Sequence, residues 1–207
     1  MILKFLPDII IFICIATYLV IYLSGIRSGK VKPTLSTWVF FAFAGVLSFI
    51  TDFRETGAQG LFANSYNILD TSGVFATLIF IVLFQKNINT KFNKLEKWCL
   101  VAVIIVGILW LLSGQNVLAH LSIQLILFIS YIPMFVHLWK AKENTESLSM
   151  WSIDSVASAV GSINPIVNRY LLSTVYGLRS ALSTFLTVLL ILRLKYKARK
   201  LSTLSAQ

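Results

Sequence analysis

Three ionisable residues, Asp70, Asp154 and Arg179, stand inside long apolar stretches of the sequence. A charge at membrane depth costs roughly 2.5–3.5 kcal/mol on insertion scales and usually marks a functional site. A guanidinium grips a carboxylate through two parallel hydrogen bonds, so Asp70 and Arg179 would give a pocket one anionic and one cationic wall. Such walls suit a zwitterion or a small carboxylate better than a neutral sugar. The alternative is an Asp70–Arg179 ion pair that only neutralises itself between packed helices.

Other polar residues in these stretches are weaker indications of a functional site. His120 and Gln124 are four residues apart and share a helix face, where they either line a pathway or hydrogen-bond a neighbouring helix. No Cys, His or Glu joins them at ligand spacing in the sequence, so we expect no metal site. The sequence has no Gly-rich phosphate loop or Ser-His-Asp constellation, so we expect neither an enzyme nor a cofactor. Asp52 and Glu55 are predicted to lie in a solvated rim at the outer end of the second helix. The alternative is that they form an outer gate.

The elements that must position these residues are membrane-spanning helices. Of the 207 residues, 57% are hydrophobic and 13% are charged, whereas a soluble domain is typically about 45–50% apolar and about 25% charged. A spanning helix needs about 20 mostly apolar residues. The sequence therefore predicts an all-α membrane protein with seven transmembrane helices, at residues 7–26, 34–53, 64–85, 96–113, 116–139, 149–167 and 174–193.

The net charge of +10 is distributed as in a membrane protein rather than a nucleic-acid-binding one. With the N-terminus outside, 14 Lys and Arg residues fall in the inner segments and 3 in the outer segments. The positive-inside rule then predicts an external N-terminus and a cytoplasmic C-terminus. The basic stretch at 195–200 is expected to face anionic lipid. We expect the plasma (inner) membrane and no nucleic-acid partner.

Two parts of the chain look alike. Tyr18 and Trp38 have the same spacing as Tyr131 and Trp151, and each Trp ends a Leu-Ser-x-Trp sequence after a basic linker. With an offset of 110, residues 65–84 lie over residues 175–194, and Tyr66 pairs with Tyr176. Both correspondences predict that the chain contains an internal duplication.

A duplication of three helices needs one extra crossing to keep both copies in the same orientation. We therefore expect two parallel three-helix bundles, residues 1–90 and 115–200, joined by a linker helix in 91–114 and followed by a cytoplasmic tail, 201–207. The predicted linker helix carries no charge after Lys97 and almost no polar side chain, as expected for a helix that faces lipid. Transporters with such repeats bind substrate near the midplane, between the repeats.

The second copy carries the most specific motif. It contains Tyr131-Ile-Pro133-Met134, a basic residue at Lys140 and a Glu-Ser-Leu-Ser sequence at 146–149. This stretch resembles the PQ-loop signature of the superfamily that includes SWEET, cystinosin and KDEL-receptor proteins, with Met134 where that signature has Gln. The arrangement of three, one and three helices resembles a full-length SWEET.

The resemblance implies where a substrate would bind. SWEET-like proteins place a polar side chain at matching points of the third and seventh helices, and here those points hold Asp70 and the pair Arg179 and Ser180. The companion positions on the second and sixth helices match Thr51 and Asn164. These five residues are the substrate-binding site that the resemblance implies.

The resemblance also suggests coupling and gating residues. Cystinosin-like members imply that Asp154 couples transport to protons; the alternative is an early-turn Asp stabilised by the helix N-terminus. Trp38 and Trp151 are expected to anchor the inner interface or to form an inner gate. Pro133 should kink its helix, and Pro165 either acts as a hinge or ends its helix.

The sequence thus predicts a membrane transporter of a small polar solute, either a sugar or an amino acid or carboxylate, that works by alternating access. The alternative is a receptor or interaction protein on the same scaffold, as KDEL receptors illustrate. The expected partners are the solute and membrane lipids. The sequence leaves open whether the protein forms a homo-oligomer.

Overall fold

The computed structural model describes residues 2–31, 33, 35–85, 94–141, 144 and 146–204, and every regular element in this part of the chain is an α-helix. Helices α2 and α9 continue beyond the stretches expected from the sequence. The helices are α1 (Ile2–Arg27), α2 (Leu35–Ala63), α3 (Ser65–Phe84), α4 (Lys94–Ser113), α5 (Asn116–Ser130), α6 (Ile132–Lys140), α7 (Leu148–Gly161), α8 (Ile163–Val167) and α9 (Leu171–Leu204).

Six helical stretches of the described chain are long and apolar enough to cross a membrane. They lie in α1, α2, α3, α4 and α9 and in the combined stretch Asn116–Lys140, which joins α5 and α6. Exposed Leu, Ile, Val and Phe side chains cover much of their surface, as expected where lipid rather than water surrounds a helix. This is the pattern of a multi-pass membrane protein.

The seventh expected span, residues 149–167, is divided into α7 and α8. The segments that contain Pro133 and Pro165 are both broken, whereas α1 continues past Pro7 near its N-terminal end. Pro133 occupies the first turn of α6, directly after the break at Tyr131, and Pro165 lies inside α8, after the break at Ser162. Proline has no backbone N–H to donate to the preceding turn, which explains why the regular hydrogen bonding of α5 and of α7 ends just before these positions.

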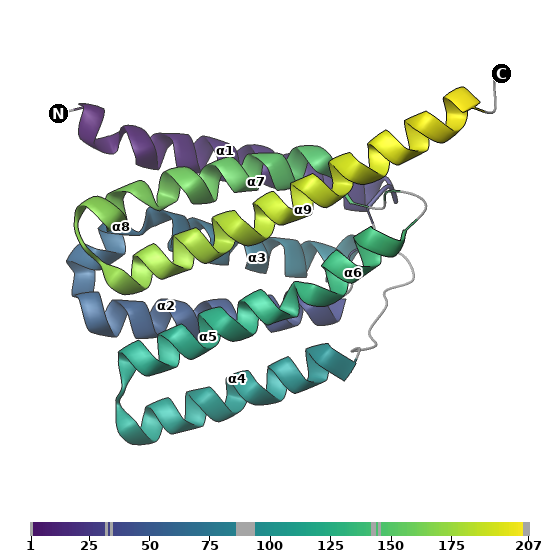
Figure 1. Cartoon of the computed structure of the whole chain (residues 1–207). Coiled ribbons are helices and arrows are strands. Elements are labelled where there is room, and N and C mark those ends of the chain that lie inside the picture. Colours follow the sequence, from purple (N-terminus) through teal and green to yellow (C-terminus); the bar gives the residue numbers. More distant parts are fainter. Residues whose placement is uncertain are drawn as a thin grey trace.

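Helix α4 lies at the side of the bundle (Figure 1). We refer to α1, α2 and α3 as the first group and to the helices from α5 to α9 as the second group. Helix α3 packs against both α1 and α2, and α9 packs against α7 and against α5 and α6. Between the groups, α1 packs on α7 and α2 packs on α5. Helix α4 contacts α5 and α2 and carries several of the most exposed apolar side chains, among them Trp98 and Leu112.

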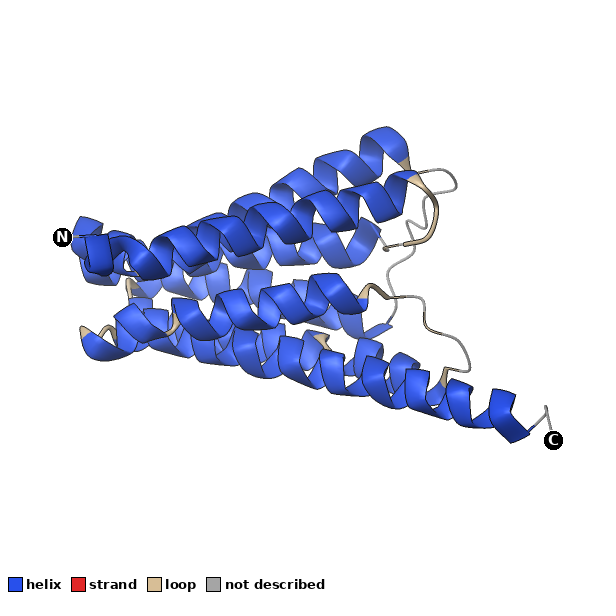
Figure 2. Cartoon of the chain, turned by 90° about the horizontal axis from the view of Figure 1, so that it is seen from above, coloured by secondary structure: helices blue, strands red, loops and turns tan. Residues whose placement is uncertain are grey.

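The two termini lie at opposite ends of the bundle (Figure 1). We call the end that holds the N-terminus the outer end and the end that holds the C-terminus the inner end. Seen from above, the helices lie closer together at the outer end and diverge toward the inner end (Figure 2). The α5–α6 break is near the inner end, and the α7–α8 break is near the outer end (Figure 1).

Candidate functional site

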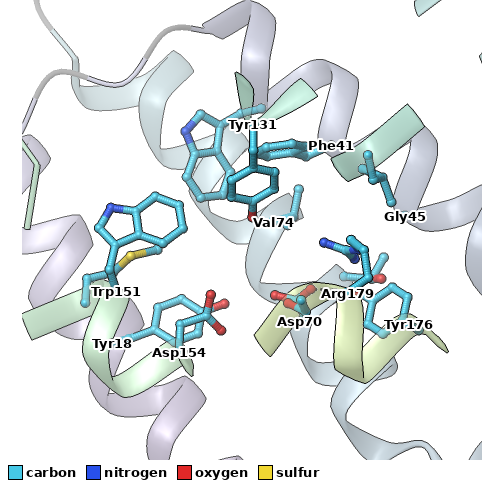
Figure 3. A pocket seen from close by; sticks show the side chains of 15 residues that line it. Tyr18, Phe41, Gly45, Asp70, Val74, Tyr131, Trp151, Asp154, Tyr176 and Arg179 are labelled. Atoms are coloured by element: carbon cyan, nitrogen blue, oxygen red, sulfur yellow. Dashed lines mark hydrogen bonds between the residues drawn. The ribbon is translucent and has the colours of Figure 1, made fainter. Parts of the chain in front are cut away.

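A cavity of about 50 Å³ lies between the two groups of helices. Its lining comes from α1, α2, α3, α5, α7 and α9 and from Tyr131, whereas α4 contributes no residue to it in the described structure. The wall combines aromatic rings with a few charged side chains (Figure 3). Six residues that the sequence singled out line it: Trp38, Asp70, Trp151, Asp154, Arg179 and Ser180.

Other predicted residues lie outside this cavity. The Thr51 side chain is buried and donates to the carbonyl oxygens of Leu47 and Ser48, both at 2.9 Å, so its hydroxyl is already used within α2. Asn164 lies in α8, beyond the break at Ser162, because that break ends α7 before the position is reached. Pro165 is buried in the same short helix. The side chain of Pro133 falls outside the described residues.

Asp70 and Arg179 face the same cavity, but each has its own partner. The Tyr176 hydroxyl donates to Asp70 Oδ2 at 2.6 Å, and Arg179 Nε donates to Gln124 Oε1 at 3.1 Å. No ion pair joins the two charges in the described structure. The guanidinium also lies over the Tyr176 ring, 5.1 Å from its centre, and close to the Tyr131 hydroxyl (Figure 3).

Two tyrosines connect α3 with α9 at the centre of the molecule. Tyr66 and Tyr176 are buried and their ring centres are 5.9 Å apart. The Tyr66 hydroxyl is hydrogen bonded to Ser180 Oγ at 2.7 Å, as Tyr176 is to Asp70. The sequence signal for this pair was present, because Tyr66 and Tyr176 match in the internal alignment, but their hydrogen-bonding role was not predicted.

Asp154 is nearly inaccessible, with 6% of its surface exposed. The Tyr66 hydroxyl lies 3.2 Å from its Oδ1 and donates to it, and no second side chain of the described residues donates to this carboxylate. Asp154 borders the cavity beside Tyr18 and Trp151 (Figure 3). It therefore lies in an aromatic environment with little compensation for a negative charge, rather than at a solvated helix start.

Gln124 holds Arg179 through a chain of buried contacts. Gln124 Nε2 donates to Ser48 Oγ at 2.7 Å and lies 3.2 Å from His120 Nε2. His120 Nδ1 lies 3.2 Å from the Ser48 carbonyl oxygen, which only accepts hydrogen bonds. This arrangement fits a neutral imidazole with its proton on Nδ1, and it turns the amide oxygen of Gln124 toward Arg179. The sequence left two roles open for His120 and Gln124. In the structure both are hydrogen bonded to Ser48 of the neighbouring helix α2.

Aromatic rings surround the inner side of the cavity. Tyr22 and Trp38 lie 5.5 Å apart between ring centres, Phe41 stacks on Tyr131 at 5.5 Å, and Tyr131 meets Trp151 edge-on at 6.2 Å. Trp38 and Trp151 are buried, at 7% and 5% exposed. They therefore border the cavity rather than projecting outward as belt anchors.

Trp151 is held from the loop before α7. Its Nε1 donates to Glu146 Oε2 at 3.1 Å. Burial raises the pKa of the Glu146 carboxyl above its usual value, and the bond from Trp151 partly offsets this rise. Glu146 thus links the orientation of a cavity-lining ring to a titratable group outside the spanning helices.

The outer end is closed by Asp52, which the sequence analysis had placed on a solvated rim. Asp52 is only 5% exposed. Its carboxylate accepts hydrogen bonds from Asn64 Nδ2 at 2.6 Å and from Ser173 Oγ at 2.9 and 3.1 Å. Glu55, one turn further, is exposed and accepts from Asn116. The rim interpretation is thus wrong for Asp52, which joins α2 to α9.

The described residues contain no group of three or more His, Cys, Asp or Glu side chains placed to hold a metal ion. Comparison of the chain with protein-family models, curated proteins and solved structures finds no match.

Proposed function

We propose that this protein transports a small polar solute across a membrane by alternating access at the cavity between its two groups of three helices. The observation that carries the proposal is a charged and aromatic cavity lined by helices of both groups, in a bundle with six described helical stretches apolar enough to span a membrane. Ionisable side chains at such a depth are a functional-site signature in membrane proteins.

The packing supports a duplicated architecture of seven spans, in which α5–α6 and α7–α8 each count as one. In each triplet the last helix packs against the other two. Across the triplets, the first helix of one packs on the second helix of the other, in both directions: α1 on α7 and α2 on α5. These contacts support the proposal that a pseudo-twofold axis relates the triplets, with α4 as the linker at the side.

Cavity residues support the same relation. Tyr18 and Trp38 from the first triplet and their sequence counterparts Tyr131 and Trp151 all line the cavity. A substrate site between repeats is the arrangement found in repeat-built transporters. In this proposal the cavity is the shared site, and the SWEET-like resemblance of residues 131–151 points the same way.

Alternating access requires a gate on each side of the site. At the outer end, Asp52 and Ser173 join the two triplets. At the inner end, Trp38 and Trp151 border the cavity from opposite triplets. In the proposed cycle the Asp52 contacts break when the outer side opens, the two Trp residues gate the inner side, and the breaks beside Pro133 and Pro165 act as hinges.

Uptake by purified protein in proteoliposomes tests this function. Labelled sugars, amino acids and carboxylates are supplied one at a time, with and without an inward proton gradient. Saturable uptake of at least one solute, lost in Asp70→Ala and Arg179→Ala but kept in the exposed-site variant Glu55→Gln, supports the proposal. Absence of flux across the whole panel, together with tight binding of a peptide or protein, would favour the receptor alternative instead.

A further inference from the structure

The cavity carries two carboxylates and one guanidinium, from Asp70, Asp154 and Arg179. Asp70 and Arg179 lie on one side, and Asp154 lies on the other with Trp151 and Tyr18 (Figure 3). The cavity therefore has a positive group at one side and a weakly compensated negative group at the other. A solute that fills it must present groups of both signs to avoid leaving a buried charge unpartnered.

Arg179 is prepared to bind a carboxylate. Its Nε is engaged by Gln124, and the amide of Gln124 is fixed by Ser48 and His120 from α2 and α5. The rest of the guanidinium borders the cavity. Its terminal nitrogens are the pair that binds a carboxylate in a bidentate manner, for which a fixed orientation is needed.

Asp154 has the surroundings that suit an ammonium group. The carboxylate is almost fully buried, and Tyr66 donates to it over the rather long distance of 3.2 Å. The rings of Tyr18, Tyr131 and Trp151 line the cavity beside it. Aromatic faces attract a cation when it is desolvated. An ammonium would therefore gain both an opposite charge and ring faces at this side.

The size of the cavity limits the solute further. One water needs roughly 10–15 Å³ on the measure by which this cavity has about 50 Å³. A cavity of this volume holds only a few water molecules, and a hexose has twice as many heavy atoms as alanine. In this conformation the space fits a compact molecule rather than a sugar ring.

From these observations, and resting on the proposed transport function, we propose that the solute is a small zwitterionic amino acid. Its carboxylate binds Arg179, which Gln124 positions through His120 and Ser48. Its ammonium binds Asp154 between the aromatic rings.

Competition in proteoliposomes tests the solute class. Uptake of labelled glycine, L-alanine and L-serine is measured against unlabelled L-alanine, L-alanine methyl ester, N-acetyl-L-alanine and D-glucose. We expect uptake of at least one of the three amino acids, with free L-alanine competing at least tenfold better than the ester, which lacks the carboxylate, and than the N-acetyl compound, which lacks the ammonium. Equal competition by ester or N-acetyl compound overturns the inference.

The same experiment separates failure of the inference from failure of the transport function. Saturable D-glucose uptake that L-alanine leaves unaffected would overturn the zwitterion inference and keep the transporter. Lack of uptake of every solute in the panel would overturn the transport function on which the inference rests.

Variants test the roles of the individual side chains. Gln124→Ala should raise the apparent KM for alanine about tenfold with a smaller change in maximal rate, and should leave weak competition by the methyl ester unchanged, because the ester does not use Arg179. Asp154→Asn should remove the preference for L-alanine over N-acetyl-L-alanine, while Glu55→Gln, the same change at an exposed carboxylate, should preserve it. If properly folded Gln124→Ala, monodisperse on size exclusion, weakens ester and alanine equally, Gln124 does not position a carboxylate-binding group.

Discussion

Tyr66 and Tyr176 each bond to the residue four positions after the other. Tyr66 bonds to Ser180 at 2.7 Å and Tyr176 bonds to Asp70 at 2.6 Å, across ring centres 5.9 Å apart. The two tyrosines match at an offset of 110 residues, and so do Asp70 and Ser180. One local hydrogen-bonding pattern therefore occurs twice, in opposite directions, at the contact of α3 with α9.

Loss of either tyrosine hydroxyl should destabilise the contact of α3 with α9. A hydrogen bond between neutral groups contributes about 0.5–1.5 kcal/mol and one to a charged group about 1.5–3 kcal/mol. Tyr176→Phe removes the donor to the Asp70 carboxylate, whereas Tyr66→Phe removes both the bond with Ser180 and the donor to the Asp154 carboxylate. We expect both variants to lower the thermal unfolding midpoint in detergent, Tyr66→Phe more than Tyr176→Phe. Tyr196→Phe, at a 73% exposed site, is the control that should change nothing; a larger loss in Tyr176→Phe would contradict the assignment.

Gly161 lets α7 approach α3 closely. A Cβ built at this position would lie 2.4 Å from Cβ of Tyr66, so Gly161→Ala must displace that tyrosine. Overpacking of this kind typically costs about 1–3 kcal/mol, measurable as a lower unfolding midpoint. Gly107→Ala in α4 is the matched control, since its nearest neighbour is the flexible end of Leu47 at 3.3 Å. Equal midpoints for the two variants would show that α7 has room to move.

The Asp52 contacts should control access from the outer side. Asp52→Ala leaves Asn64 and Ser173 without their acceptor, which costs about 1–3 kcal/mol for buried groups, and this favours the open outer end. In a background with Cys14 and Cys99 replaced by Ser, a cysteine introduced at buried Ser162 reports this opening. We expect faster labelling by an impermeant thiol reagent in Asp52→Ala. The exposed-site variant Glu55→Ala should leave the rate unchanged, and a similar rise there would argue against a gate at Asp52.

Glu146 should make stability depend on pH. Its pKa is raised by burial, so the folded state binds the proton more tightly than the unfolded chain. The stabilisation is fully present below the unfolded pKa and is lost as pH rises through the folded pKa. We expect the unfolding midpoint of the wild type to fall over this range relative to that of Glu146→Gln, whose amide oxygen still accepts from Trp151. Parallel midpoint curves from pH 4 to 7 would contradict a buried carboxylate.

The basic segments predict the orientation of the chain in the membrane. With a cytoplasmic C-terminus, green fluorescent protein fused after Gln207 should fluoresce and alkaline phosphatase fused there should be inactive, because phosphatase folds only where disulfides form. The reverse pattern would invert the orientation and exchange the inner and outer gates. Fusions after Ser113, between α4 and α5, provide the opposite control.

The sequence predicted the positions of the helices well, but it predicted poorly which side chains contact each other across helices. Apolar runs bounded by basic linkers set the helix positions, because length and hydrophobicity alone decide which segments span a bilayer. Asp70, Asp154 and Arg179, which line the cavity, were identified as candidate functional residues because intramembrane charges are costly. The partners of Arg179 and Asp52 were not, because each depends on how two helices are rotated. Ser173, for instance, is 121 residues from Asp52.

Thr51 and Asn164 illustrate a second limit. The SWEET-like resemblance gave them companion positions on two corresponding helices, but the Thr51 hydroxyl bonds to carbonyl groups of its own helix and lies 3.2 Å from His120 Nδ1, and the break at Ser162 removes Asn164 from the regular course of α7. Alignment of two copies transfers position along the chain. It does not transfer the direction in which a side chain points when one copy has a break that the other lacks.

The breaks at Tyr131 and Ser162 both belong to the second triplet and lie toward opposite ends of the bundle. The first triplet has its own irregularity at Gly57 of α2, where φ is +66°, but this residue lies beyond the Asp52 contact. In the proposed transport cycle, bending would therefore be concentrated in the second triplet, at two separate positions. Opening at one end of the cavity would then not require the other end to move with it.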